Sequence, residues 1–304
     1  MLSDPPRSRG SDGSDTLAYV QIVLGISLFG TGAIFIRLID LPATTIVAAQ
    51  GLIAVLTLIA AHVLRRPRMS LRLPCDHRLI LVLGLLFAAD HLLFTSGIQR
   101  TTVANLITLA YLYPVFTALL SVWILKERLQ PYVLAAFAFA ILGTAIILYP
   151  SLAEFRIGDL QASGMGLGVA LLAATSRILV KKLDPSVPSM TVNTYKYGVI
   201  ALLFSPGLAG LGGNLDLSTT LFIFGNGLLS GVFAALLVLT GVRKVEANKG
   251  AVLGYAEPVV ALGLAWLVLA EQPSRFSVMG GALIFGASYL VIRGRRPTPS
   301  RPPL

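Results

Sequence analysis

Long apolar stretches separated by short polar segments run along almost the whole chain. A helix needs about 17 to 25 mostly apolar residues to cross about 30 Å of hydrocarbon at about 1.5 Å rise per residue. Ten stretches reach this length, at residues 17–36, 43–64, 79–98, 103–125, 132–149, 160–180, 191–211, 219–240, 248–270 and 276–292. The pattern predicts an all-α integral membrane protein with ten transmembrane helices, and the short connections predict one compact bundle.

A residue pattern occurs twice in the chain. Tyr111, Pro114, Val115 and Glu127 recur 144 positions later as Tyr255, Pro258, Val259 and Glu271. The repeat divides the chain into two halves of five predicted helices, at residues 16–150 and 158–293. Because five is odd, the second half enters the membrane upside down relative to the first. Two inverted five-helix repeats are typical of carriers that open alternately to either side of the membrane.

The basic residues indicate how these helices are oriented. Lys and Arg concentrate in cytoplasmic loops, and with both termini inside, most of the 24 basic residues, Arg177 among them, fall on the cytoplasmic side. The opposite side keeps Arg37, Arg100, Arg156 and Arg275, and Lys196 lies within a predicted helix. This asymmetry favours ten crossings of a bacterial inner membrane. Residues 1–15 and 294–304 are polar and rich in Pro, Ser or Arg, which predicts disordered cytoplasmic ends and no cleavable signal peptide.

Composition supports a membrane protein. Apolar residues make up 55% of the chain, charged residues 12%, and the mean hydropathy is +0.80. The net charge of +10 is explained by orientation and contact with anionic lipid, so no nucleic-acid partner is expected. The lone Cys75 has neither a disulfide partner nor metal-ligand spacing. We expect no metal and no cofactor, and the oligomeric state is open between monomer and homodimer.

Pro114 and Pro258 fall near the middle of two predicted helices. Each proline removes a backbone hydrogen bond and disfavours a straight path, and freed carbonyls persist in a membrane only where protein or a watery cavity satisfies them. The two prolines are therefore candidate hinges, although fixed kinks that improve packing are an alternative. Glu127 and Glu271 lie about 20 Å further along their helices. We expect them to be structural or gating residues, through salt bridges or caps on the following helix.

Two segments resemble the drug/metabolite transporter superfamily, in its EamA-like branch of ten-helix exporters. They are LAYLYPVFTALLSVWILKER at residues 109–128 and LGYAEPVVALGLAWLVLAE at residues 253–271. The resemblance extends over both halves and implies export of small metabolites, with amino acids as a narrower possibility. Many relatives carry a basic residue where this chain has Gln50, whereas the matching place in the second half holds Lys196.

Ionisable groups at membrane depth are costly and are candidates for function. An amino acid presents both a carboxylate and an ammonium group, so a binding pocket needs a cation and an anion. Lys196 with Asp90 or Glu257 would supply both. The candidate substrate-binding residues are Asp90, His91, Tyr111, Tyr113, Lys196, Asn226, Tyr255 and Glu257. Pairing of the charged groups with one another, and packing of the tyrosines, remain open as structural alternatives.

Other functional classes fit the sequence less well. Asp90 and His91 are adjacent, so on a helix they diverge by about 100° and make a poor acid–base couple. No H-E-x-x-H motif and no phosphate-binding P-loop occur, so we expect neither an enzyme nor an ATPase. A channel or a lipid scramblase is a further alternative, but mirrored kinks in a duplicated chain favour a secondary carrier. Drugs, amines, sugars and nucleotides remain possible cargo.

Overall fold

The protein is helical throughout the part of the chain that the structure describes. In this computed structural model that part comprises residues 10–64, 76–100, 106, 109–153, 160–212, 215–257, 260 and 275–293. The helices of the first half are α1 (Gly10–Leu38), α2 (Ala43–Leu64), α3 (His77–Arg100), α5 (Tyr113–Ile124) and α6 (Pro131–Ala153). Those of the second half are α7 (Leu160–Val180), α8 (Ser189–Leu203), η2 (Ser205–Leu211), α9 (Leu217–Gly225), η3 (Asn226–Ala234), α10 (Ala235–Val242), α11 (Ala247–Leu253) and α13 (Arg275–Arg293).

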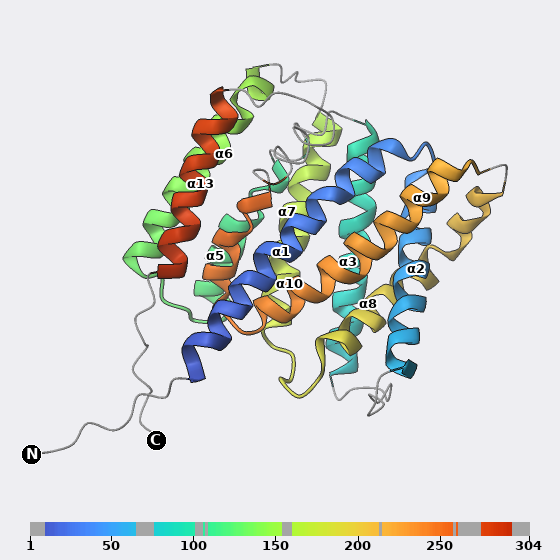
Figure 1. The fold of residues 1–304 in the computed structure, drawn as a ribbon, viewed down its shortest axis with the longest axis horizontal. Helices are drawn as coiled ribbons and strands as arrows, with labels where there is room; N and C mark the ends of the chain where they lie inside the picture. The colour runs from blue at the N-terminus through green and yellow to red at the C-terminus, as the bar shows by residue number, and fades with distance from the viewer. Residues whose placement is uncertain are drawn as a thin grey trace, which may run out of the picture.

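The two halves pack against each other helix by helix. In Figure 1, α6 and α13 lie side by side at one flank of the bundle, and α1 runs beside α10. Other close pairs across the halves include α2 with α8, α3 with α7 and α5 with α11. When each helix is replaced by its counterpart in the other half, the pair α1 with α10 becomes α7 with α3. The pairs α6 with α13, α2 with α8 and α5 with α11 map onto themselves. The packing therefore follows the sequence repeat.

Length and composition alone identify fewer membrane spans than the sequence pattern predicts. Within the described ranges, four helical segments are long and apolar enough to cross a membrane: Thr16–Leu38, Ala43–Leu64, His77–Arg100 and Leu217–Val242. The apolar stretches of α5, α6, α7 and α13 are shorter. Large apolar side chains such as Trp123, Phe285 and Leu202 are exposed on the outside, as expected for a surface in contact with lipid. The count of ten stays a prediction.

Close contact between α6 and α13 depends on glycine. A Cβ atom at Gly143 would lie 2.6 Å from the carbonyl oxygen of Gly280, and a Cβ at Gly280 would lie 2.6 Å from Cγ1 of Ile147. Neither distance leaves room for a methyl group. Small residues at such crossings let helix backbones approach closely and pack by van der Waals contact.

Gly280→Ala should therefore destabilise the protein. We expect a loss of about 1–3 kcal/mol from overpacking, which would lower the thermal unfolding midpoint measured in detergent. Gly286→Ala is the matched control, because Gly286 lies on the same helix and a Cβ there meets nothing within 4 Å. Equal midpoints for the two variants would show that the crossing tolerates a methyl group.

Candidate substrate cavity

A central cavity of about 220 Å³ lies between the two halves. Seven of the eight predicted substrate-binding residues line it: Asp90, His91, Tyr111, Tyr113, Lys196, Asn226 and Glu257. They come from α3, from the segment around the start of α5, from α8, from η3 and from the residues after α11. Gln50 also lines the cavity from α2. The structure thus brings together Gln50 and Glu257, which are 207 positions apart in sequence.

A break in the helix path lets two tyrosines face the same space. The predicted helix 103–125 is not continuous, since Tyr111 and Leu112 form a turn and α5 begins at Tyr113 with Pro114 in its first turn. Proline is favoured there because its missing N–H would have no helical partner. Tyr111 and Tyr113 would be about 200° apart on an unbroken helix, yet both line the cavity. The turn at Tyr111 and Leu112, just before Pro114, changes the direction of the chain so that both tyrosines reach the cavity.

The second half has a break at the equivalent position. Helix α11 ends at Leu253, and Gly254 and Tyr255 form a turn before Glu257. Tyr255 differs from the prediction, because it is buried in the hydrophobic core and is not among the described residues that line the cavity. A Cβ at Gly254 would collide with the hydroxyl of Tyr113, so the glycine makes room for that tyrosine. Pro258 and Glu271 lie outside the described residues.

A π-helical segment supplies polar groups to the cavity. Between α9 and α10 the helix widens to the π form over Asn226–Ala234, within the stretch that the sequence predicts as one regular helix. Asn226 and Ser230 line the cavity from this segment. Single π turns are rare and are frequent at functional sites. A hydrophobicity pattern does not reveal such widening, so the π segment could not be predicted from it.

Charged groups of both signs meet aromatic rings in the cavity. Nζ of Lys196 lies 3.7 Å from the ring centroid of Phe87, which is a cation–π contact. Lys196 also interacts electrostatically with Asp90. Nδ1 of His91 lies 3.6 Å from Oδ2 of Asp90, and the His91 ring stacks at 4.0 Å between centroids on Phe87. Phe29 and Phe94 complete an apolar wall.

Arg177 lines the cavity but is not among the predicted binding residues. Its position near the end of α7 indicated a cytoplasmic charge, but Cζ of its guanidinium lies 4.5 Å from the ring centroid of Tyr113 and the residue lines the cavity. It interacts electrostatically with Glu257. Helical side chains point toward the N-terminus of their own helix, which for α7 directs Arg177 back into the bundle.

Polar atoms without partners gather in this cavity. Among the described residues, seven buried side-chain atoms of cavity-lining residues have no hydrogen bond: Asp90 Oδ1, His91 Nδ1, Tyr113 OH, Ser176 Oγ, Arg177 Nη1, Asn226 Oδ1 and Ser230 Oγ. A buried polar atom left unpaired costs about 1–3 kcal/mol, and native proteins pair nearly all of them. Eight further atoms of this kind lie in described residues outside the cavity lining, but these seven belong to residues that line one space, where water or a polar ligand can supply the missing partners.

Comparison with known proteins gives the family. The model of the EamA-like transporter family matches residues 16–149 and again residues 160–293. The chain belongs to the EamA-like transporter family. The resemblance seen in the sequence is thereby confirmed, and the match extends over both halves.

Individual relatives of this EamA-like transporter agree with that assignment. It is 29% identical to the uncharacterized transporter YdfC of Bacillus subtilis over 71% of its own length and 72% of the relative. It is 26% identical to a protein of Rickettsia bellii named S-adenosylmethionine uptake transporter, over 72% and 73% of the two chains. A crystal structure of a protein at 22% identity matches the fold with a TM-score of 0.76, covering 92% of this chain and 97% of the other. This protein is a membrane transporter and not an enzyme.

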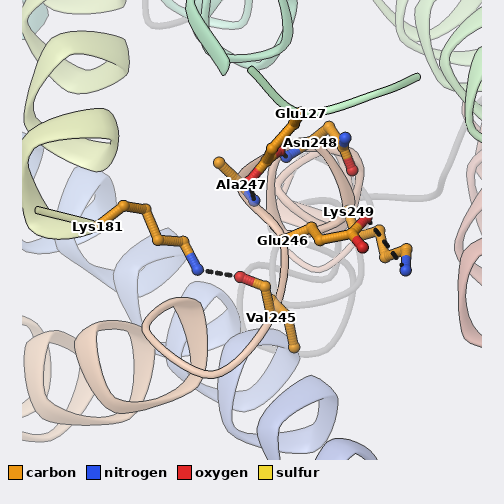
Figure 2. A network of polar contacts seen from close by, with 7 residues as sticks. All are labelled: Glu127, Lys181, Val245, Glu246, Ala247, Asn248 and Lys249. Carbon is orange, nitrogen blue, oxygen red and sulfur yellow. Dashed lines mark hydrogen bonds and ion pairs between the residues drawn. The ribbon is translucent and has the colours of Figure 1, made fainter. Parts of the chain in front are cut away.

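Glu127 joins the two halves of the transporter at one end of the bundle. One carboxylate oxygen accepts a hydrogen bond from the backbone N–H of Ala247 at 2.9 Å, and the other accepts from that of Asn248 at 3.2 Å (Figure 2). Glu127 follows α5, whereas Ala247 and Asn248 begin α11. A carboxylate at a helix N-terminus satisfies free N–H groups and complements the helix dipole. Glu127 therefore caps a helix of the opposite half, and not the following helix as the sequence predicted.

The backbone before Glu127 is held in an uncommon conformation. Lys126 has a φ of 57°, the left-handed region that residues other than glycine rarely occupy. This turn lets the N–H of Glu127 donate to the carbonyl of Ser121 at 3.2 Å. It also turns the carboxylate toward α11. Such conformations cost about 1–3 kcal/mol and persist where surrounding contacts fix them.

Proposed function

We propose that this transporter is a secondary carrier that exports amino acids or related small metabolites by alternating access. Ten spans, as inverted repeats at residues 16–150 and 158–293, would place both termini in the cytoplasm and the cavity near the midplane of a bacterial inner membrane. The pairing of helices across the halves supports this arrangement, because the five helix pairs named above map onto one another when the halves are exchanged. Exchange of equivalent contacts is the basis on which such repeats open to one side and close to the other.

The cavity's combination of opposite charges carries the proposal. Arg177 and Lys196 are cations, Asp90 and Glu257 are carboxylates, and all four line the same space. A zwitterionic amino acid could place its carboxylate on a cation and its ammonium on a carboxylate, with additional donors and acceptors from the unpartnered groups. The aromatic wall of Phe29, Phe87 and Phe94 suits an apolar side chain. An uncharged, apolar cargo would offer these four groups no charged partner and would leave them to pair with one another.

S-adenosylmethionine is a second candidate cargo. A relative is named for its uptake, and the molecule carries the same ammonium and carboxylate groups as an amino acid, together with a sulfonium cation and an adenine ring. A carboxylate and an aromatic wall would suit both of these additional groups. The relative is named for uptake, whereas we propose export for this protein. The direction of transport is therefore tested separately from the identity of the cargo.

Counterflow in proteoliposomes tests the function. Vesicles preloaded with an unlabelled amino acid should accumulate the labelled form transiently, with saturation, for members of a panel of neutral, aromatic, basic and hydroxylated amino acids and S-adenosylmethionine. A carrier produces this exchange and an open pore does not, so flux that neither saturates nor exchanges would refute the carrier. Repeating the assay with and without an imposed proton gradient measures coupling. Labelling the two termini from either side tests the inverted arrangement, which requires both on one face.

A further inference from the structure

A second pocket lies outside the central cavity, at the ends of helices α7 and α10 and the start of α8. Its volume is about 310 Å³, and its described lining includes Lys181, Arg243 and Lys244 together with the apolar side chains of Leu183 and Val187. Among the described lining residues, those that carry charge are all basic. The pocket therefore presents positive charge beside apolar surface.

Two of these cations are fixed in place without being neutralised. Arg243 donates to the carbonyl oxygen of Val187 at 2.5 Å and to that of Asp184 at 2.7 Å. Lys181 donates to the carbonyl oxygen of Val245 (Figure 2). Carbonyl oxygens orient a cation but carry no net charge, so both side chains retain their positive charge. Lys244, next to Arg243, is exposed.

The nearby carboxylates are hydrogen-bonded or paired, and they offset part of the positive charge. Glu127 accepts from two backbone N–H groups of α11. Oδ2 of Asp76 accepts from the N–H of Asp184, and Oδ1 of Asp184 accepts from the N–H of Ser186. Glu246 pairs with Lys249 at 3.2 Å. Glu127 and Glu246 act electrostatically on Lys181, and Asp184 and Asp76 act on Arg243, but none of these acids is among the described lining residues.

We propose that this pocket binds the phosphate of an anionic phospholipid headgroup, with Lys244 and Lys181 as its ligands and Arg243 as a fixed part of the positive wall. The pocket sits where helices end, which in a membrane is the depth of the headgroups. Basic pockets between transmembrane helices on the cytoplasmic side bind anionic headgroups. Leu183 and Val187 are buried beside the cations and offer apolar contact for the start of an acyl chain. A free phosphate ion would use the cations alone.

Stabilisation of the purified transporter by short-chain lipid tests this site. Dioctanoyl phosphatidylglycerol should raise the thermal unfolding midpoint in detergent, whereas dioctanoyl phosphatidylcholine should raise it less. The concentration for half the effect should increase about fivefold when Lys244 is replaced by Gln, and more in the Lys181→Gln, Lys244→Gln double variant, because each basic group near a membrane surface contributes about that factor. Lys182→Gln is the matched control, since Lys182 is exposed and adjacent to Lys181 but is outside the described lining.

Each outcome of this test is decisive. Equal shifts with the two lipids, or an unchanged response in Lys244→Gln, would overturn the site. Lys244→Gln keeps the test valid if Lys181→Gln disturbs folding, because the Lys244 side chain is exposed. Stabilisation by inorganic phosphate at the same concentration as the lipid would overturn the assignment to a headgroup. The site is independent of the cargo and of the direction of transport.

The pH dependence of lipid binding gives a second measurement. Burial lowers the pKa of Lys181 to about 8, with Glu127 and Glu246 acting in the opposite direction and Arg243 in the same direction. The ammonium group is therefore charged below pH 8 and loses its charge as the pH rises above that value. The lipid effect should weaken between pH 7 and pH 9 in the wild type. In Lys181→Gln it should weaken less over the same range.

Discussion

Lys196→Met and Glu257→Gln should each lower amino-acid counterflow by about ten- to a hundredfold. Both side chains line the central cavity, and a hydrogen bond to a charged group contributes about 1.5–3 kcal/mol, which corresponds to roughly that range at about 1.4 kcal/mol per tenfold. Removal of either charge also leaves the opposite charge of the cargo without a partner in a desolvated space. The two substitutions should lower the transport rate much more than they lower the thermal stability of the protein or its affinity for lipid.

The controls separate binding from folding. Lys182→Met makes the same substitution at an exposed lysine outside the described cavity lining and should transport like the wild type. Each variant should elute as a single peak in size-exclusion chromatography before its flux is compared. Arg177→Lys should lower counterflow by an intermediate amount, because it keeps the positive charge but loses the planar guanidinium that can bind a carboxylate through two hydrogen bonds. Wild-type counterflow in both Lys196→Met and Glu257→Gln would exclude the charged cavity as the cargo site.

The helix pattern could be predicted where a helix is regular and apolar throughout. The predicted ranges 43–64 and 160–180 coincide with α2 and α7, since a change from apolar to polar residues marks both ends of each segment. The break at Tyr111 and the π segment at Asn226 could not be placed in this way. Both concern which backbone hydrogen bonds form, and the apolar pattern is the same whether a helix is continuous or interrupted.

The cavity residues could be predicted because charge inside an apolar helix is rare. Asp90, Lys196 and Glu257 stand out against apolar neighbours, and the structure brings all three to one space. Arg177 could not be found by that rule, since it is three residues from the end of α7 and was counted as an interfacial charge. The residue spacing along α7 does indicate which side of the helix faces the cavity. Besides Arg177, the residues of α7 that line it are three or four positions apart: Val169, Ala173, Ser176 and Val180. Arg177 lies next to this stripe.

Tyr255 shows the limit of inference from a repeat. It corresponds to Tyr111 by sequence, and both tyrosines are buried in the same hydrophobic core cluster, yet of the two only Tyr111 is among the described residues that line the cavity. A repeat therefore predicts equivalence of position and burial, but not which member of a pair reaches the cavity. The same reasoning applies to Glu127, whose capping of α11 depends on how the two halves meet at one end.

Glu127→Ala should open the end of the transporter at which the halves now meet. The substitution removes both acceptors of the α11 cap, and loss of a cap typically costs about 1 kcal/mol. Because Glu127 follows a helix of the first half and caps one of the second, this cost falls on the conformation in which the halves are joined. Conformations that lack the contact lose nothing, so the population shifts toward them by up to about tenfold.

Labelling of a cavity cysteine measures that shift. In a Cys75→Ser background, Ser176→Cys places a thiol in the cavity lining, and a membrane-impermeant maleimide applied to inside-out and right-side-out vesicles reports which side has access. We expect Glu127→Ala to raise the labelling rate from one side only, the side of the basic loops, by up to about tenfold. Glu246→Gln is the matched control, because Glu246 pairs with Lys249 within the same half and its loss leaves the contact between halves intact. Equal labelling rates for Glu127→Ala and Glu246→Gln would mean that the Glu127 cap stabilises α11 without closing the cavity.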